Sequence, residues 1–354
     1  MTAVEATRTA EVARLYGPGD VQLTREAAPS SGPGEVLLEV TAVGLCGSDL
    51  HWYRRGGIGD AGLIRPLVLG HEFGGVILAG PRAGERVAAD PADPCGRCEP
   101  CRRGRTNICI APRFAGFGTT DGALRSVMPW PSHLLHRVPD AIADDEVALL
   151  EPLGVALHAL DLAPIAVGAR AGVYGCGPLG LLLVQLLRAR GASVIVATDR
   201  LAHRVAAARA LGATHGFVVS AEPDDPAAVG GEPRDVPVDV AFEVAGDDAA
   251  IADAIAAVKP GGRVALVGIP DDDRSSFPAA AARRKELSFH VCRRMAQTDL
   301  PRAIAVAEAG QVDLSALITH RFPLGDASDA FAMLASRHGR KVVVNPALPA
   351  SDRP

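Results

Sequence analysis

Four cysteines fall within fifteen consecutive residues of this 354-residue chain. Their spacing is C-x2-C-x2-C-x7-C, formed by Cys95, Cys98, Cys101 and Cys109 on a segment that also contains Gly and Pro. Such a loop can turn all four sulfurs toward one point, which is the tetrahedral geometry that structural Zn²⁺ requires. Disulfide pairing is the alternative, but nothing in the sequence indicates an oxidising compartment. The quartet therefore predicts a closed zinc site that has no open position for chemistry.

Length and composition limit the class of protein. The chain exceeds one typical domain, so two domains are expected, and 48% hydrophobic residues are enough for substantial cores. A net charge of −5 does not favour binding to nucleic acid or to an acidic membrane, because both are negatively charged. The N-terminus lacks a signal-peptide core, and the longest apolar run, 179–187, is too short to span a bilayer. The sequence therefore predicts a soluble cytoplasmic protein.

The chain changes character after Glu151. Residues 1 to about 156 contain short strands broken by Gly and Pro, which is typical of an all-β barrel or sandwich. Beyond them, strands are expected at 171–175, 193–198, 238–246 and 263–270, and helices at 178–190 and 200–211. This alternation of short apolar strands with helices predicts a parallel, doubly wound sheet.

A glycine-rich turn joins the first of these strands to its helix. It reads Gly175-Cys176-Gly177-Pro178-Leu179-Gly180. Gly175 permits the tight turn, Gly177 lets a pyrophosphate approach the backbone, and Gly180 allows close packing of helix on strand. The free N–H groups of the helix N-terminus would then bind the phosphates. A glycine-rich βα turn without a ligand is the alternative, but the strand–turn–helix context favours a dinucleotide site.

An acidic residue at the end of the next strand bears on the choice of cofactor. Asp199 lies nineteen residues after Gly180, close to the offset expected for a carboxylate that binds the ribose hydroxyls. A carboxylate there would repel the 2′-phosphate of NADP, so NAD is favoured. The adjacent Arg200 opposes this preference, and Arg204, one helical turn beyond, can stack near the adenine.

A second set of metal-binding residue types is spread over the first half of the chain. Cys46 follows one apolar strand, and His71 and Glu72 precede another. Each residue alone is better explained as a buried structural residue. Together they offer a thiolate, an imidazole and a carboxylate, all of which can bind Zn²⁺. Glu151 adds a carboxylate where the β-rich region meets the α/β region, and sites often lie at such junctions.

These motifs together resemble the zinc-containing medium-chain alcohol dehydrogenases, and most of all their sorbitol (polyol) dehydrogenase branch. The resemblance rests on CGSDLHWY, GHEFGG, the cysteine quartet, EPLGVALHA, GCGPLG, the strand ending in Asp199, and VALVGIP. It implies an α/β plus β fold, with a GroES-like catalytic domain and a Rossmann dinucleotide-binding domain. The catalytic domain would comprise residues 1–156 and 291–354, and the Rossmann domain residues 157–290.

The resemblance also implies roles for individual residues. Cys46, His71 and Glu72 would hold a catalytic zinc, to which Glu151 would bind directly or through its water, and the quartet would hold a second, structural zinc. Ser48 would accept the proton of the alcohol and His51 would pass it toward solvent, although Ser48 can also cap the turn. The residues expected to bind the cofactor are Gly175, Gly177, Pro178, Leu179, Gly180, Asp199, Arg204, Val267, Gly268 and Ile269.

The positions expected to contact substrate depart from the branch pattern. They are Trp52, the Phe117-Gly118 pair, Glu151 and Arg294. Trp52 stands where sorbitol dehydrogenases tend to have a tyrosine, and Met295 replaces the tyrosine that follows the arginine. Buried polar groups select polar substrates, and two tyrosine hydroxyls of the branch pattern are missing here. The expected substrate is therefore not specifically sorbitol, and other polyols, sugar acids, cyclitols and amino-cyclitols are alternatives.

The sequence therefore predicts an enzyme that transfers a hydride from a secondary hydroxyl to NAD, giving a ketone, in a homo-oligomer of two or four chains. Zinc with an open position would act as a Lewis acid on the substrate oxygen. Alternatives are the same chemistry on an amino alcohol, as in threonine dehydrogenases, and a binding protein that kept only the fold. A zinc-ribbon nucleic-acid module is a further alternative, but acidic residues offset the arginines around the quartet.

Overall fold

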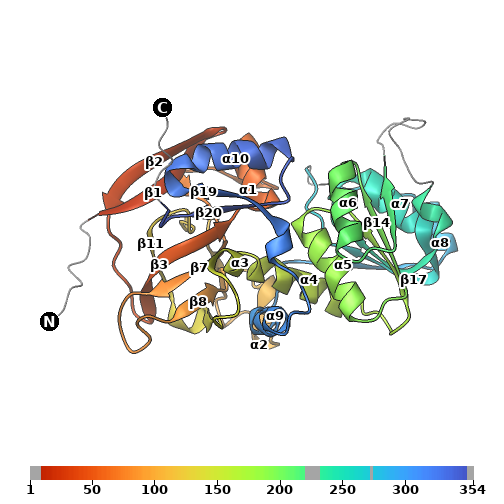
Figure 1. Ribbon diagram of the computed structural model, residues 1–354, viewed down its shortest axis with the longest axis horizontal. Helices are drawn as coiled ribbons and strands as arrows, with labels where there is room; N and C mark the ends of the chain where they lie inside the picture. The colour runs from red at the N-terminus through yellow and green to blue at the C-terminus, as the bar shows by residue number, and fades with distance from the viewer. Residues whose placement is uncertain (1–8, 220–231, 272–273, 349–354) are drawn as a thin grey trace. The chain divides into compact units, whose positions relative to one another are not determined.

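The computed structural model describes residues 9–219, 232–271 and 274–348. The chain divides into two compact units, which are described separately (Figure 1). The first comprises Met1–Glu151, Leu300–Glu308 and Leu314–Pro354, and the second comprises Pro152–Asp299 and Ala309–Asp313. The C-terminal part of the chain therefore returns to the unit in which it begins. The predicted domain boundaries, at 156/157 and 290/291, differ from the limits of the compact units by five and nine residues, and the second unit also includes Ala309–Asp313.

The first unit is built mainly from β-strands. Its largest sheet contains β3 (Glu35–Gly44), β7 (Glu72–Ile77), β8 (Arg86–Ala89), β11 (Val127–Pro131), β12 (Leu135–Arg137), β19 (Ile318–Pro323) and β20 (Lys341–Asn345). Their order is β12-β8-β7-β3-β20-β19, and β11 also pairs with β3. The central strand β3 therefore joins early strands of the chain to the last one.

Shorter strands and helices complete the first unit. The strands are β1 (Thr9–Gly17), β2 (Asp20–Ala27), β4 (Gly57–Ile58), β5 (Ala61–Gly62), β6 (Leu67–Val68), β9 (Ala92–Asp93) and β10 (Arg113–Phe114). The helices are α1 (Gly47–Arg55), α2 (Glu99–Arg102), α3 (Asp144–Val147) and α10 (Ala327–Ser336), with 3-10 turns at Thr106–Ile108, Ser132–Leu134, Ser315–Leu317 and Leu324–Asp326. The unit is thus mostly β, as predicted, but it also includes helices that strand spacing alone did not reveal.

Large aromatic residues fill the core of the first unit. Trp130 and Phe73 are each about 1% exposed, and their rings meet edge to face at 6.0 Å. The Trp130 indole donates a hydrogen bond of 2.8 Å to the Asp90 carbonyl, so its polar atom is satisfied within the core. Burial of such side chains provides most of the driving force for folding of the unit.

The end of strand β3 is unusually crowded. Gly44 is paired with Glu72 on one side and with Val343 on the other. A Cβ atom at Gly44 would lie 2.3 Å from the Glu72 carboxylate and 2.7 Å from Cε of Lys341. Only glycine leaves room for these two side chains, so the residue type at position 44 shapes the site described below.

The second unit contains a six-stranded parallel sheet. Its strands are β13 (Arg170–Tyr174), β14 (Val194–Asp199), β15 (His215–Val218), β16 (Val238–Glu243), β17 (Val258–Leu266) and β18 (Ser288–Val291), in the order β15-β14-β13-β16-β17-β18. The order reverses between β13 and β16, and ligands of such sheets bind beyond the carboxyl ends of the strands at that point. The Gly-rich turn follows β13 directly.

The helices of the second unit alternate with these strands (Figure 1). They are α5 (Pro178–Ala189), α6 (Ala202–Ala210), α7 (Asp248–Ala257) and α8 (Ala279–Arg284), with a 3-10 turn at Pro233–Asp235. Helices α4 (Leu150–Leu162) and α9 (Asp299–Glu308) contain residues of both units. This alternation confirms the predicted α/β plus β fold, with element ends shifted by one or two residues for the first strands and helices. Within the described part of the chain, no helix is long and apolar enough to cross a membrane.

Candidate active site

Cys46 lies at the start of helix α1, just after the end of β3. Its backbone N–H donates a hydrogen bond of 2.9 Å to the Asp49 carboxylate, which lies three residues further along the chain. This is the contact that an acidic residue makes in a helix capping box. The half-buried thiol is therefore held at the N-terminus of this helix.

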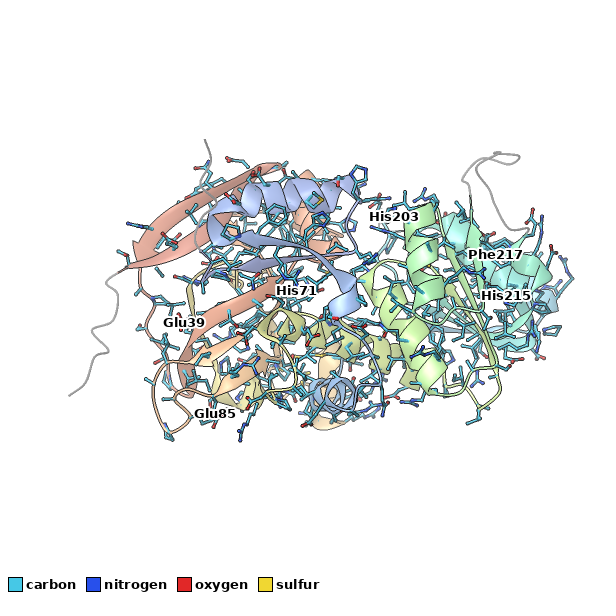
Figure 2. The ribbon with its side chains drawn as sticks, in the orientation of Figure 1. Glu39, His71, Glu85, His203, His215 and Phe217 are labelled. Atoms are coloured by element: carbon cyan, nitrogen blue, oxygen red, sulfur yellow. The ribbon has the colours of Figure 1, made fainter. Side chains whose placement is uncertain are left out.

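His71 and Glu72 lie where strand β7 begins, beside Cys46. They are 8% and 2% exposed, and Figure 2 marks His71 within the first unit. The Cys46 sulfur, an imidazole nitrogen of His71 and a Glu72 carboxylate oxygen all lie within 4.8 Å of one another. A soft thiolate, an imidazole and a carboxylate fit the ligand set of a zinc ion with one position left for substrate.

Asp49 is a residue of the candidate site that the sequence analysis did not single out. Its Oδ1 lies 3.4 Å from Nδ1 of His71, and its side chain is 1% exposed. Burial by itself lowers the pKa of His71, but the Asp49 carboxylate outweighs it, so this pKa is raised well above its usual value. The site therefore favours positive charge, which a divalent ion would supply. The capping position of Asp49 was the available signal for it.

Ser48 and His51 lie on the same short helix as Asp49. The Ser48 hydroxyl is 3.4 Å from Nε2 of His71, so it lies beside the candidate ligands. His51 is half-buried one position before the buried Trp52. The helix thus presents a hydroxyl and an imidazole within one turn of each other, an arrangement that can relay a proton.

Glu151 and Lys341 are two further buried charged groups of this region. Glu151 is 7% exposed, and it lies outside the three-residue cluster that the described residues form. Burial, with the charge of Glu72, raises the pKa of Glu151 to about 7 against the opposing charges of His71 and Lys341. The ammonium group of Lys341 donates hydrogen bonds to the Glu72 carboxylate and, at 3.0 Å, to the Leu45 carbonyl. Lys341 was also missed from the sequence.

Two aromatic contacts involve residues of the candidate site. The rings of Trp52 and Phe117 meet edge to face at 5.7 Å, and Phe114 lies 5.5 Å from the His71 ring. Trp52 is only 2% exposed, whereas Phe117 is 41% exposed and is followed by the half-buried Gly118. Phe114 therefore packs against a candidate ligand, whereas Trp52 is part of the buried core of the first unit.

Arg294 and Met295 belong to the second unit. Arg294 is half-buried and has a φ of 53°, an uncommon backbone conformation for a residue other than glycine. Met295 is 4% exposed, and its sulfur would lie 2.5 Å from a Cβ atom at Gly154. Met295 therefore fills space against helix α4, which gives a packing reason for methionine at this position.

The cysteine quartet forms a second cluster in the first unit. All four sulfurs lie within 4.8 Å of one another, and those of Cys98 and Cys109 are 3.9 Å apart. The seven cysteines of the chain all lie in its described part and are free thiols. Backbone N–H groups of Ile110 and Cys101 lower the pKa of Cys98 to about 6, which favours a thiolate. Four convergent sulfurs fit a closed tetrahedral zinc site better than a pair of disulfides.

The Gly-rich turn of the second unit has the close contacts expected of a dinucleotide site. Gly175 has a φ of 113°, and a Cβ atom there would lie 2.8 Å from the Ala245 nitrogen. A Cβ atom at Gly180 would lie 1.9 Å from the Gly175 carbonyl oxygen, so helix α5 packs closely on the turn. Gly177, Pro178 and Leu179 are half-buried at the N-terminus of that helix.

The Asp199 side chain is hydrogen-bonded to the Gly-rich turn. One of its carboxylate oxygens accepts a hydrogen bond from the backbone N–H of Cys176 at 2.8 Å, and the other accepts one from Leu201 at 2.9 Å. Arg204 lies 3.9 Å from the same carboxylate. The neighbouring Arg200 forms an ion pair with Asp247 at 3.2 Å, which draws its charge toward that carboxylate.

Glu243, at the carboxyl end of β16, connects two loops of the second unit. Its carboxylate accepts a hydrogen bond of 2.6 Å from Gly246, and its carbonyl accepts one of 2.8 Å from Val267. A Cβ atom at Gly268 would lie 2.2 Å from the Gly246 nitrogen, so the loops are in close contact, with Ile269 49% exposed. Burial raises the pKa of Glu243 to about 7. No sequence motif indicated that Glu243 connects these loops.

Comparisons with known proteins agree with this architecture. Residues 32–140 match the family model described as the alcohol dehydrogenase GroES-like domain, and residues 178–309 match that of the zinc-binding dehydrogenases. Sorbitol dehydrogenase of Bacillus subtilis (strain 168) is 34% identical over 344 residues, which cover 95% of this chain and 97% of the relative.

Solved structures are similar along nearly the whole chain. L-idonate 5-dehydrogenase from Escherichia coli has a TM-score of 0.86 and 26% identity, covering 95% of this chain and 98% of its own. A second similar structure is a protein from Escherichia coli CFT073, described as a short chain alcohol dehydrogenase complexed with NADH. It has a TM-score of 0.85 and 28% identity, and the match covers 96% of this chain and 99% of that protein.

Fold, ligand sets and comparisons together define a zinc-binding dehydrogenase with a GroES-like and a Rossmann-type region. The chain belongs to the zinc-containing medium-chain alcohol dehydrogenase family, in its sorbitol (polyol) dehydrogenase-like branch, and is an oxidoreductase. The family resemblance inferred from the sequence motifs is thereby confirmed.

The raised pKa of Glu243 predicts a pH-dependent cost in stability. The unfolded carboxyl titrates near 4.5 and the folded one near 7, so the unfolded state loses its proton first as the pH rises. The stability from the protonated form is complete below pH 4.5 and is lost as the pH approaches 7. Glu243→Gln has no carboxyl proton to lose, so it lacks this pH-dependent loss of stability. The free energy of unfolding of the variant minus that of the native protein should therefore be larger at pH 8 than at pH 5, by up to about 3 kcal/mol.

Urea unfolding at pH 5 and pH 8 measures this difference. Glu286→Gln, at an exposed position of the same unit, is the matched control and should show no such change. If the difference in free energy of unfolding between Glu243→Gln and the native protein is equal at the two pH values, burial does not raise the pKa of Glu243.

Proposed function

We propose that the chain is a zinc- and NAD-dependent dehydrogenase that oxidises a secondary hydroxyl of a polyol, sugar or cyclitol-type substrate to a ketone. The observation that carries this proposal is the convergence of Cys46, His71 and Glu72, whose ligand atoms lie within 4.8 Å of one another. All three ligands of an open zinc site are present, which favours an enzyme over a binding protein that kept only the fold.

Each group near this ligand set has a role in the proposed reaction. A zinc ion bound there would polarise the substrate hydroxyl as a Lewis acid, and NAD would accept the hydride. Asp49 orients His71 through Nδ1 and so leaves Nε2 for the ligand position. Ser48, 3.4 Å from that nitrogen, is placed to accept the hydroxyl proton, and His51 on the same helix passes it to solvent.

A polyol-type substrate is supported by the polar groups near the candidate metal. The buried Glu151 carboxyl can bind further hydroxyl groups, and a site that satisfies such groups rejects substrates that lack them. The sorbitol and L-idonate dehydrogenases to which this chain is similar carry names of polyol and sugar-acid substrates. Trp52 and Phe117 would contact the C–H face of the substrate, and Arg294 would bind a polar substituent.

NAD is proposed as the cofactor on the evidence of Asp199. Its carboxylate lies beside the Gly-rich turn, where it can accept ribose hydroxyls and repel a 2′-phosphate. Arg200, the residue that could favour NADP, is drawn to Asp247. The remaining cofactor contacts are assigned to Gly175, Gly177, Pro178, Leu179, Gly180, Arg204, Val267, Gly268 and Ile269.

The cysteine quartet is proposed to hold a structural zinc, which gives two zinc ions per chain. Its closed ligand set leaves no position for substrate, so its contribution would be to folding. The GroES-like domain is proposed to comprise 1–156 and 291–354, and the compact units support this discontinuous arrangement. Homo-oligomer formation and a cytoplasmic location stay predictions.

A substrate screen tests the proposed reaction directly. NAD reduction, followed by absorbance at the NADH wavelength, should occur with one or more polyols, cyclitols or amino-cyclitols. Cys46→Ser should lower kcat/KM by about a hundred- to a thousandfold, because the loss of an electrostatic catalyst costs about 2.7–4 kcal/mol. Full activity of this variant would contradict the role of Cys46, and activity only with primary alcohols would contradict the substrate class.

Metal analysis tests the two ligand sets separately. The purified protein should contain two zinc ions per chain, and Cys46→Ser and Cys98→Ser should each contain one. Cys98→Ser should lower the melting temperature more, because a closed zinc site contributes its binding free energy to folding. One zinc per chain in the native protein would remove either the catalytic or the structural assignment.

Replacement of Asp199 tests the cofactor preference. Asp199→Ala should lower the ratio of kcat/KM for NAD to that for NADP by about ten- to hundredfold, because a hydrogen bond to a charged group contributes about 1.5–3 kcal/mol. Arg200→Ala is the matched control and should change the ratio less, since Arg200 is paired with Asp247. An unchanged ratio in Asp199→Ala would mean that this carboxylate does not read the ribose.

A further inference from the structure

A lysine ammonium group is buried beside the proposed catalytic ligands. Lys341, the first residue of strand β20, is 1% exposed, and its Nζ donates hydrogen bonds to the Glu72 carboxylate and to the Leu45 carbonyl. Glu72 is a proposed metal ligand, and Leu45 directly precedes another, Cys46. One amine therefore connects the two segments that supply the thiolate and the carboxylate.

The sheet is constructed so that this contact can form. Strand β3 lies between β7, which carries Glu72, and β20, which carries Lys341. The two side chains meet over Gly44, where a Cβ atom would lie 2.3 Å from the carboxylate and 2.7 Å from the lysine Cε. The missing side chain at Gly44 thus opens the space in which a cation reaches a metal ligand.

The residue type of this cation is informative in this chain. Lysine occupies only three of the 36 Lys and Arg positions. An ammonium group is compact and can direct its three N–H groups to different acceptors, whereas a guanidinium is a larger planar fork. The gap over Gly44 fits the smaller group.

Charge balance gives Lys341 a specific task. With zinc bound, the Cys46 thiolate and the carboxylates of Glu72 and Asp49 would place three negative charges around two positive ones. Lys341 supplies the third positive charge, and its charge also acts favourably on Asp49 and Glu151. Buried carboxylates without such compensation are strongly unfavourable.

We propose that Lys341 is a positioning residue that tunes the catalytic metal by competing with it for the Glu72 carboxylate. This competition weakens metal binding and leaves more of the metal's positive charge for the substrate oxygen. The inference rests on the proposed function, because it requires that Cys46, His71 and Glu72 hold the metal.

Lys341→Met tests the proposal by removing the competing charge at similar side-chain length. The dissociation constant of Zn²⁺ from this site, measured by competition with a chromophoric chelator, should fall at least about tenfold, which corresponds to about 1.4 kcal/mol. The visible spectrum of the Co²⁺-substituted protein should shift as Glu72 binds more strongly. With zinc, kcat should fall while KM for NAD stays within about twofold. Tighter metal binding with slower turnover is a combination that simple structural damage does not produce.

Three further variants make the test specific. Lys341→Gln removes the charge but keeps a donor for the Leu45 carbonyl, so it should also tighten Zn²⁺ binding if Lys341→Met folds poorly. In a Glu72→Gln background, Lys341→Met should no longer tighten it. Lys285→Met is the matched control, because Lys285 donates to three carbonyls at the end of helix α7, in the second unit, and should leave the Zn²⁺ dissociation constant unchanged.

The outcomes separate this proposal from the proposed function. Unchanged or weaker Zn²⁺ binding in both Lys341→Met and Lys341→Gln, with two zinc ions in the native protein, overturns the role of Lys341 alone. A native protein whose Cys46, His71 and Glu72 set binds no Zn²⁺ overturns the proposed function itself.

Discussion

The Asp49 carboxylate is the contact on which the candidate active site depends. One of its oxygens accepts the backbone N–H of Cys46, and the other lies 3.4 Å from Nδ1 of His71. The same side chain therefore begins helix α1, places the thiolate, and orients the imidazole. Because Asp49 is 1% exposed, its hydrogen bonds are not exchanged for water, and the geometry of two ligands is fixed together.

The second unit uses a carboxylate in a comparable way. Asp199 accepts N–H groups from Cys176, within the Gly-rich turn, and from Leu201, at the start of the next helix. The residue proposed to recognise the ribose thus also holds the turn proposed to bind the pyrophosphate. In both units a carboxylate thus accepts backbone N–H groups, and its remaining lone pairs are left for the proposed site. Loss of either acid should affect position as well as charge.

The sequence was sufficient for those features that depend on local patterns. Alternating strands and helices predicted the parallel sheet, and the spacing of Cys95 to Cys109 predicted the cluster that the four sulfurs form. The ligand types of Cys46, His71 and Glu72 were recognisable from their motifs. Asp199 was singled out by its position nineteen residues after Gly180, and its carboxylate lies against the Gly-rich turn in the structure.

Residues whose roles arise from long-range contacts were not predictable in this way. Lys341 and Glu72 are 269 positions apart, and only the pairing of β20 with β3 brings them together. Glu243 acts through loops that become neighbours when β16 and β17 pair. Asp49 is local to Cys46, but its contact with His71 requires β3 and β7 to align. No motif of a single segment contains this information.

Strand β20 explains why the chain must return to its first unit. The catalytic ligands proposed from residues 46–72 would be incomplete as a charge-balanced set without an amine from residue 341, since the buried acids near them outnumber the cations. Gly44 makes this return specific, because a side chain there would separate Lys341 from Glu72. Strand β20, the last strand of the chain, therefore pairs with β3 and also carries the charge that is proposed to balance the metal ligands. In the proposed site, a chain that ended before β20 would keep Cys46, His71 and Glu72 but would lose the amine that balances their charge.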